Sequence, residues 1–273
     1  MTDPTDMNDP ADMTEPRRVA LVTGAGRGLG AAVVHRLAAD GYGVLAVDWC
    51  AGPAAAPYPM PTVDDLAAVA AGHDEVQPVV ADVRDPQALQ AAVGQAVARW
   101  GRLDVAVTAA AVVAGGHPQW STPSAELDLV WQVDALGVWH TATACVPAML
   151  AGPDPAGCRF VAVTSTAGTH GLFGLAAYTM AKHAVVGLVR ALAADLAGTG
   201  VTAVAVAPGS MRTAMLARTA QLYGVEVDEL IAHQALRRVL EPEEVAAVVA
   251  LCCSRDGAVL DGGVVAADGG FGR

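Results

Sequence analysis

The sequence is poor in aromatic and in basic side chains. Phe, Trp and Tyr make up 4% of the 273 residues, whereas apolar residues of all kinds make up 53%. The 16 Lys and Arg residues are outnumbered by 28 Asp and Glu, which gives a formal net charge of −12. Binding to a phosphate backbone needs clustered positive charge, so a nucleic-acid partner is not expected. A core of Ala, Val, Leu and Gly is predicted, which is typical of α/β domains.

Long apolar runs and paired cysteine or histidine motifs are also missing. No uninterrupted apolar stretch approaches the roughly 20 residues of a membrane-spanning helix, so no membrane association is expected. The five cysteines show neither C-x-x-C spacing nor a disulfide framework. The histidines lack paired metal-ligand spacing, and no metal site is predicted. Residues 1–17 are acidic without an apolar signal core; we expect a disordered leader on a cytoplasmic protein.

Short apolar strands alternate with helical segments along residues 18–273. The strands RVALVTG, YGVLAVD, EVQPVVAD and LDVAVTAAA are separated by segments with helical periodicity. A long helical region at 123–150, the strand RFVAVTS, a helix near 175–196, the strand VTAVAVAPG, a last helix and a final strand near GGVVAADGG follow. The pattern predicts a single α/β domain, a Rossmann-type doubly wound parallel sheet of about seven strands.

A glycine-rich turn lies between the first strand and the first helix. In TGAGRGLG, residues 23–30, Gly24 permits a tight turn, Gly28 allows close approach to a pyrophosphate, and Gly30 permits close helix packing. The same stretch contains G-x-G-x-x-A at 26–31, so its spacing does not choose between subtypes of dinucleotide fold. Its position after a strand and before a helix predicts dinucleotide binding.

The end of the second strand bears on which dinucleotide is bound. Asp48 follows Gly30 by eighteen residues, where a carboxylate can bind both ribose hydroxyls and repel a 2′-phosphate. Arg27 could pair with a phosphate and weakens that preference, but no second basic residue follows Asp48. The sequence favours NAD over NADP.

Tyr178 and Lys182 lie four residues apart in the helical stretch AAYTMAKHAV, residues 176–185. Side chains at this spacing share one helix face. A purely structural pair would leave Lys182 at the surface, yet its neighbours are apolar. Ser165 ends the fifth strand at the sheet edge where doubly wound folds bind ligands. The ammonium of Lys182 and a nearby cationic nicotinamide are both expected to favour the phenolate of Tyr178, so that Tyr178 can act as a base near neutral pH.

These motifs together resemble the short-chain dehydrogenase/reductase family. The resemblance rests on TGAGRGLG, ADV at 81–83, Ser165, YTMAK and APGSMRT. It implies that Ser165 binds the reacting oxygen, Tyr178 transfers its proton, and Lys182 holds the nicotinamide ribose. It implies a dinucleotide site made of Gly24, Arg27, Gly28, Leu29, Gly30, Asp48, Trp49, Asp82, Val83, Ala109, Ala110, Tyr178, Lys182, Pro208, Gly209, Met211 and Thr213, with Asp82 at the adenine and Pro208, Gly209 and Thr213 beside the nicotinamide.

The chain departs from the family pattern at two places. Where the family has Asn-Asn-Ala-Gly after the fourth strand, this chain has Thr-Ala-Ala-Ala at 108–111, so an Asn-mediated tie between strands is lost. Where the family has a fourth catalytic residue, an asparagine, this chain has Asp134. An aspartate can hold the same helix distortion and water while pairing with Lys182, so we expect activity to be retained.

A narrower resemblance starts from residues 49–73, a connection longer than usual, and extends to two further motifs. YPMPTVDDL, WGRLDVAVTAAAVVAGGHPQW and the ADGGF ending are similar to mycofactocin-coupled dehydrogenases. That resemblance implies that NAD stays bound and is reoxidised by the peptide-derived carrier mycofactocin. The alternative is a longer surface loop on an ordinary enzyme whose NAD exchanges freely.

Residues outside these motifs suggest the substrate and the assembly. His117 and Trp120 are expected at the substrate mouth. A lid is expected from Met211 to His233, and its apolar side chains favour an alcohol with an apolar body. By analogy with the family, Trp131 and Trp139 suggest a subunit contact and a homotetramer. A non-catalytic NAD-binding regulator is the other class of function, but it would not need Ser165, Tyr178 and Lys182 together.

Overall fold

A seven-stranded parallel sheet forms the centre of the computed structural model, which describes residues 17–52 and 56–272. The strand order is β3-β2-β1-β4-β5-β6-β7, and every neighbouring pair is parallel. The strands are β1 Val19–Thr23, β2 Gly43–Asp48, β3 Val76–Val80, β4 Val105–Thr108, β5 Arg159–Val163, β6 Thr202–Pro208 and β7 Val264–Ala267. The predicted doubly wound fold is confirmed. The predicted leader, apart from Arg17, lies outside the described residues.

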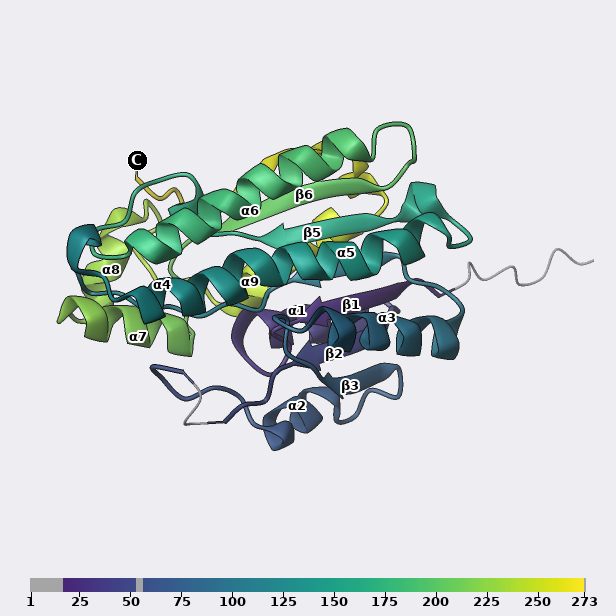
Figure 1. Ribbon diagram of the computed structural model, residues 1–273, viewed down its shortest axis with the longest axis horizontal. Helices are drawn as coiled ribbons and strands as arrows, with labels where there is room; N and C mark the ends of the chain where they lie inside the picture. The colour runs from purple at the N-terminus through teal and green to yellow at the C-terminus, as the bar shows by residue number, and fades with distance from the viewer. Residues whose placement is uncertain (1–16, 53–55, 273) are drawn as a thin grey trace, which may run out of the picture.

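Helices cover both faces of the sheet (Figure 1). One face packs against α1 (Gly28–Ala39), α2 (Val63–Ala70) and α9 (Pro242–Cys253). The other face packs against α3 (Pro86–Trp100), α4 (Ser124–Val130), α5 (Gly137–Leu150) and α6 (Ala176–Asp195). None of the helices within the described residues is long and apolar enough to cross a membrane.

The strands are continuously apolar because both of their faces are buried. In β1, Val19 and Leu21 belong to the core on the α6 side, whereas Ala20 and Val22 belong to the core on the α1 side. This alternation follows from the two-residue repeat of a strand. A parallel sheet covered on both faces therefore reads in the sequence as an unbroken apolar run.

The sheet order reverses between β1 and β4, which opens a crevice at the carboxyl ends of these strands. The lid helices α7 (Ala214–Tyr223) and α8 (Val227–Leu230) lie at this end of the sheet (Figure 1). The fold thereby brings the loops after β1, β2, β4, β5 and β6 to one place.

The helical region predicted at 123–150 is not a single regular helix. Residues Trp131–Leu136 form a π-helical segment between α4 and α5. Asp134 lies within this segment and its side chain is fully buried. Such bulges in α-helices are frequent at functional sites.

Candidate active site

A cavity of about 980 Å³ occupies the crevice at the carboxyl ends of the strands. Ser165 and every residue predicted to bind the dinucleotide line this cavity, from Gly24 in the first loop to Thr213 at the start of α7. Asp134 does not line it but lies behind Lys182. His117 and Trp120 do not line it either, although the adjacent Gly116 does, so their place at the substrate mouth stays a prediction.

The glycine loop is shaped for close approach by a ligand. Gly24 and Gly28 have φ angles of 68° and 56°, a region that glycine adopts without a steric cost. A Cβ on Gly24 would lie 2.6 Å from the backbone nitrogen of Ala110. The loop leads into the N-terminus of α1, whose free N–H groups and dipole favour a bound phosphate. These features fit the pyrophosphate of a dinucleotide.

Asp48 ends β2 and is fixed against the glycine loop. One carboxylate oxygen accepts a hydrogen bond from the Gly26 N–H at 2.9 Å, and the other accepts one from the Cys50 N–H at 3.1 Å. Each oxygen keeps a further lone pair, so the carboxylate can still accept hydrogen bonds from ribose hydroxyls. The predicted role of Asp48 is compatible with this geometry.

Behind the cavity wall beyond Asp48 lies a residue that sequence reasoning missed. The guanidinium of Arg84 donates hydrogen bonds to both oxygens of Asp82, and it lies 4.2 Å from the ring centroid of Trp49. Arg84 therefore joins two predicted cofactor residues into one surface. Its position directly after the ADV motif was the only feature of the sequence that could have indicated a place near the cofactor site.

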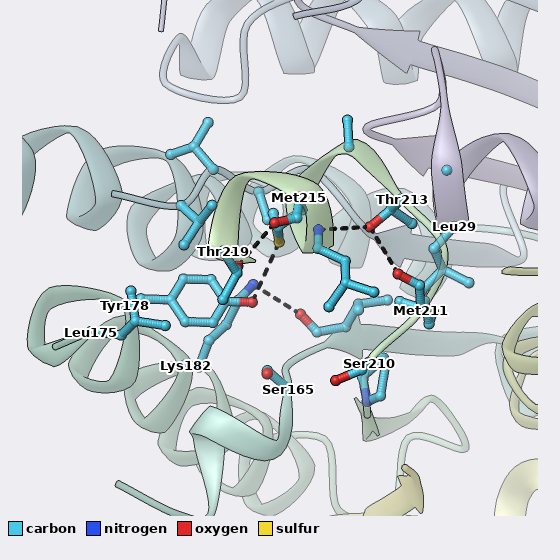
Figure 2. Close-up of a pocket in the computed structure, with 18 of the residues that line it drawn as sticks. Leu29, Ser165, Leu175, Tyr178, Lys182, Ser210, Met211, Thr213, Met215 and Thr219 are labelled. Carbon is cyan, nitrogen blue, oxygen red and sulfur yellow. Dashed lines mark hydrogen bonds between the residues drawn. The ribbon is translucent and has the colours of Figure 1, made fainter. Parts of the chain in front are cut away.

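Ser165, Tyr178 and Lys182 come together from β5 and α6 (Figure 2). The Tyr178 hydroxyl donates to the sulfur of Met215 at 3.8 Å, and Lys182 Nζ lies 5.5 Å from the Tyr178 ring centroid. Nζ also donates to the carbonyl of Val163 at 3.4 Å. Lys182 is 2% exposed, so the surface position expected of a purely structural pair is not found.

The pKa of Tyr178 departs from the sequence expectation. Burial raises the pKa of Tyr178 above its usual value; Lys182 and the Ser165 hydroxyl lower it, and Asp134 raises it further. Lys182 lowers this pKa as predicted, but burial and the charge of Asp134, which the prediction left out, raise it; the effect of a bound nicotinamide stays a prediction.

Asp134 connects the π-helical segment to two other parts of the site. Its Oδ1 accepts a hydrogen bond from the Val112 N–H at 2.9 Å, and its Oδ2 lies 3.2 Å from Lys182 Nζ. Asp134 thus ties the π-helical segment to the loop after β4 and, through Lys182, to α6. Ala110 N–H donates to the Thr23 hydroxyl at 3.3 Å, which gives β1 and β4 a contact in place of an asparagine tie.

The long connection after β2 crosses the glycine loop. Tyr58, Met60 and Pro61 line the cavity, and Tyr58 is buried. The Arg27 guanidinium lies 5.4 Å from the Tyr58 ring centroid and donates to the Pro59 carbonyl at 2.5 Å and to the Met60 sulfur at 3.4 Å. Tyr58 was not predicted as a site residue.

The outer part of the cavity is mainly apolar, with His170, Thr219, Glu229 and His233 also in its lining. The predicted lid side chains line it together with side chains from the loop after β5: Leu172, Phe173, Leu175, Met211, Met215, Leu216, Leu222 and Tyr223. The buried Gln234 accepts a hydrogen bond from the Ser210 N–H and donates to the Arg238 carbonyl at 2.8 Å. Gln234, which sequence reasoning also missed, holds the two ends of the lid together.

Comparison with known proteins agrees with this arrangement. A family model described as "Enoyl-(Acyl carrier protein) reductase" matches residues 24–272. The meso-2,3-butanediol dehydrogenase of Serratia marcescens is 33% identical over 253 residues, which cover 93% of this chain and 94% of that protein. The chain belongs to the short-chain dehydrogenase/reductase family.

Two carveol dehydrogenases are also similar to this member of the family. The (-)-trans-carveol dehydrogenase of Rhodococcus erythropolis is 36% identical over 203 residues, 73% of each chain. A solved carveol dehydrogenase from Mycobacterium avium, in complex with NAD, has a TM-score of 0.86 and 28% identity, and the match covers 93% of this chain and 96% of that one. The fold and the family resemblance predicted from the sequence are both confirmed.

Proposed function

We propose that this short-chain dehydrogenase/reductase uses NAD to interconvert an alcohol that has an apolar body and the corresponding carbonyl compound. The observation that carries the proposal is the placement of Ser165, Tyr178 and Lys182 in the same cavity as the glycine loop and Asp48. Proton-transfer groups and a dinucleotide cradle in one crevice support an oxidoreductase.

The residues of the inner cavity suit each part of the cofactor. The glycine loop and the N-terminus of α1 would hold the pyrophosphate, and Asp48 would hold the adenosine ribose and repel a 2′-phosphate. Lys182 would hold the nicotinamide ribose. When bound, NAD supplies the hydride chemistry, taking up the hydride and its two electrons from the carbon that bears the hydroxyl.

The proton moves at the Tyr178 hydroxyl. In alcohol oxidation Tyr178 Oη takes the proton of the substrate hydroxyl, and in carbonyl reduction it returns one to the carbonyl oxygen. Ser165 Oγ, which accepts a hydrogen bond from the Ala167 N–H at 3.1 Å, keeps its own proton to donate to the reacting oxygen. Lys182 supplies positive charge beside both groups.

Aliphatic and aromatic side chains bound the outer cavity, which supports a substrate with an apolar body. Met215 and Leu222 from α7 face the loop that carries Leu172 and Phe173 across this space. An apolar ligand gains about 25 cal/mol for each Å² of surface that it removes from water. The carveol dehydrogenases, by their names, act on an alcohol, and the proposal takes the same substrate class for this chain.

We also propose that NAD is held tightly and is reoxidised in place by mycofactocin. The contacts of Arg27 with Pro59 and Met60 support this, because they fasten the long connection over the glycine loop. A cofactor beneath that segment leaves only when the segment opens. The similarity of residues 49–73 to mycofactocin-coupled enzymes is the second support.

One experiment tests the oxidoreductase proposal. Protein purified without added cofactor is denatured, and the released nucleotide is identified by mass spectrometry. The intact protein is then screened with apolar alcohols and an artificial electron acceptor. We expect released NAD and alcohol-dependent reduction of the acceptor. A Tyr178→Phe control should still release NAD but should not reduce the acceptor. NAD release with no turnover of any alcohol or carbonyl compound would instead indicate a regulator.

A second experiment distinguishes NAD that stays bound through the reaction from NAD that exchanges freely with the solution. The alcohol is added to the purified protein without an acceptor, and absorbance of reduced nicotinamide is followed. We expect a single turnover per bound NAD, and continued turnover only with an external acceptor. Steady turnover on free NAD would contradict mycofactocin coupling while leaving an ordinary dehydrogenase.

Exposed apolar side chains on α5 and α6 support assembly as a homotetramer. Trp139 is 57% exposed and Met180 is 47% exposed, so both could be covered by a second subunit. Analytical ultracentrifugation of the protein and of Trp139→Glu tests this. We expect the protein to be a tetramer and Trp139→Glu to dissociate into smaller species. Monomers in both cases would contradict a homotetramer.

A further inference from the structure

A buried carboxylate lies behind the catalytic lysine. Asp134 is fully buried, and its Oδ2 is 3.2 Å from Lys182 Nζ. Within the described residues Oδ2 accepts no hydrogen bond of good geometry, so the contact with Lys182 is one of charge. Lys182 is the only lysine in the sequence.

Asp134 and Lys182 are the charged groups that face the phenol of Tyr178 in the part of the chain that the structure describes. The other groups around Tyr178 are the hydroxyls of Ser165 and Tyr58 and the sulfur of Met215. Ser165 and Met215 do not ionise near neutral pH, and burial raises the pKa of Tyr58 to about 12. The charge at Tyr178 is therefore decided by the lysine and the aspartate.

We propose that Asp134 is a positioning residue that offsets the charge of Lys182 at Tyr178, so that Tyr178 keeps its proton to higher pH than it would beside a lone ammonium group. An uncharged asparagine, which the family resemblance places here, would leave the ammonium unopposed. The pH dependence of the reaction follows the protonation of Tyr178. Carbonyl reduction, which needs the protonated phenol, extends to higher pH, and alcohol oxidation, which needs the phenolate, begins at higher pH.

Burial raises the pKa of Asp134, whereas the Lys182 ammonium and the Val112 N–H lower it and favour the carboxylate. Asp134 raises the pKa of Tyr178, against the lowering effect of Lys182. Burial lowers the pKa of Lys182, but Asp134 and Tyr178 together raise it above its usual value. The aspartate therefore keeps the buried lysine cationic for binding the ribose while limiting the effect of that cation on the tyrosine.

The test is the pH dependence of Asp134→Asn, a nearly isosteric change that removes the charge while its amide oxygen can still accept the Val112 N–H. We expect the pH profiles of kcat for both alcohol oxidation and carbonyl reduction to move to lower pH by about one unit or more, the usual size for a neighbouring charge. A merely structural role would lower kcat at every pH without moving the profile. Unmoved profiles would overturn the inference.

Asp104→Asn is the matched control. Asp104 is a buried carboxylate 2.6 Å from Arg102, and it lies before β4, at the opposite end of that strand from the cavity. Its loss reports the general effect of removing a buried carboxylate, and we expect it to leave the pH profiles in place. Should Asp134→Asn fail to fold by circular dichroism, Asp134→Ser removes the same charge with a smaller side chain.

A second readout does not depend on turnover. The ultraviolet absorption of the phenolate is followed against pH in the protein and in Tyr178→Phe. The difference between the two curves is the titration of Tyr178 alone. The same pair is then measured in the Asp134→Asn background at equal NAD content. We expect the Tyr178 signal to appear about one pH unit lower without Asp134. An unchanged titration overturns the inference.

The reaction part of this inference rests on the proposed function, whereas the titration does not. If no alcohol or carbonyl compound is turned over but the phenol titration moves, the proposed function fails and the charge relationship stands. If turnover is found and neither the pH profiles nor the titration move, the proposed function stands and the charge relationship fails.

Discussion

The carboxylate of Asp48 accepts a hydrogen bond from the Gly26 N–H at 2.9 Å, which fixes the end of β2 against the glycine loop. The acid is 7% exposed and lines the cavity, so its charge is close to any ligand that reaches this loop. Its geometry therefore serves loop structure and is compatible with the proposed discrimination between dinucleotides.

Asp48→Asn should raise the affinity for NADP relative to NAD. The amide oxygen can still accept the Gly26 N–H, while the charge that repels a 2′-phosphate is removed. We expect the ratio of the two affinities to change at least about tenfold, or 1.4 kcal/mol, by calorimetry on nucleotide-free protein. Asp40→Asn, at the exposed far end of α1, is the control. An unchanged ratio would show that Asp48 does not face the ribose.

Tyr178→Phe should abolish proton transfer while leaving NAD bound. The change removes only the hydroxyl that donates to Met215, so the packing of the ring is kept. We expect kcat to fall by about 10² to 10⁴, the usual contribution of a general acid or base, with no change in NAD content. Tyr42→Phe removes a hydroxyl that contacts Arg18 outside the cavity and should keep kcat. Near-normal turnover of Tyr178→Phe would refute the assignment.

The sheet and the arrangement of Tyr178 with Lys182 could be predicted because they depend on local rules. Apolar runs of strand length separated by helical periodicity are enough to predict a doubly wound parallel sheet of about seven strands. The four-residue spacing places Tyr178 and Lys182 on one helix face. The burial of Tyr178 and the approach of Asp134 raise the pKa of Tyr178 against the predicted effect of Lys182. They could not be predicted, because they depend on packing between segments far apart in the chain.

Tyr58 and Gln234 could not be recognised from local pattern for the same reason. Tyr58 lies in a proline-rich connection that reads as a surface loop, yet the fold buries it beside Arg27. Gln234 reads as an ordinary polar residue after the lid helices. It is buried only because the loop after β6 and the segment at Arg238 return to it from both sides.

Arg27→Met should speed the release of NAD. The variant loses the hydrogen bond to the Pro59 carbonyl but keeps an apolar stem against Tyr58. A single hydrogen bond contributes about 0.5–1.5 kcal/mol, so we expect release to be roughly 2 to 13 times faster. The rate is measured by chasing bound NAD with labelled NAD. Arg36→Met, on the exposed face of α1, is the matched control. Equal rates would show that this contact does not retain the cofactor.

Gln234→Leu should destabilise the lid and the protein together. Leucine fills a similar space but leaves the Ser210 N–H and the Arg238 carbonyl without their partner. A buried unsatisfied group costs about 1–3 kcal/mol, so we expect a clear fall in the free energy of unfolding by urea titration. Gln221→Leu, an exposed glutamine on α7, is the control. An unchanged free energy would mean that water replaces Gln234.

Glu244→Gln should lower heat stability at neutral pH but not in acid. The side chain of Glu244 accepts hydrogen bonds from both terminal nitrogens of Arg238 and from the Glu241 N–H, which lowers its pKa from 4.5 to about 2 in the folded protein. The pKa is lowered in the folded state, so the stabilisation is complete above the unfolded value near 4.5 and is lost as pH falls toward 2. Glutamine can keep the contact with the Glu241 N–H while losing the charge.

We therefore expect the Tm of the protein to exceed that of Glu244→Gln at pH 7 and the difference to shrink as the pH falls below about 4.5. Because the pair is exposed, the measurement is made at low salt, where screening is weakest. Glu243→Gln removes the same charge from the same turn of α9 and controls for the helix dipole. A Tm difference that is constant between pH 7 and pH 3 would show that the contribution of Glu244 does not come from its charge.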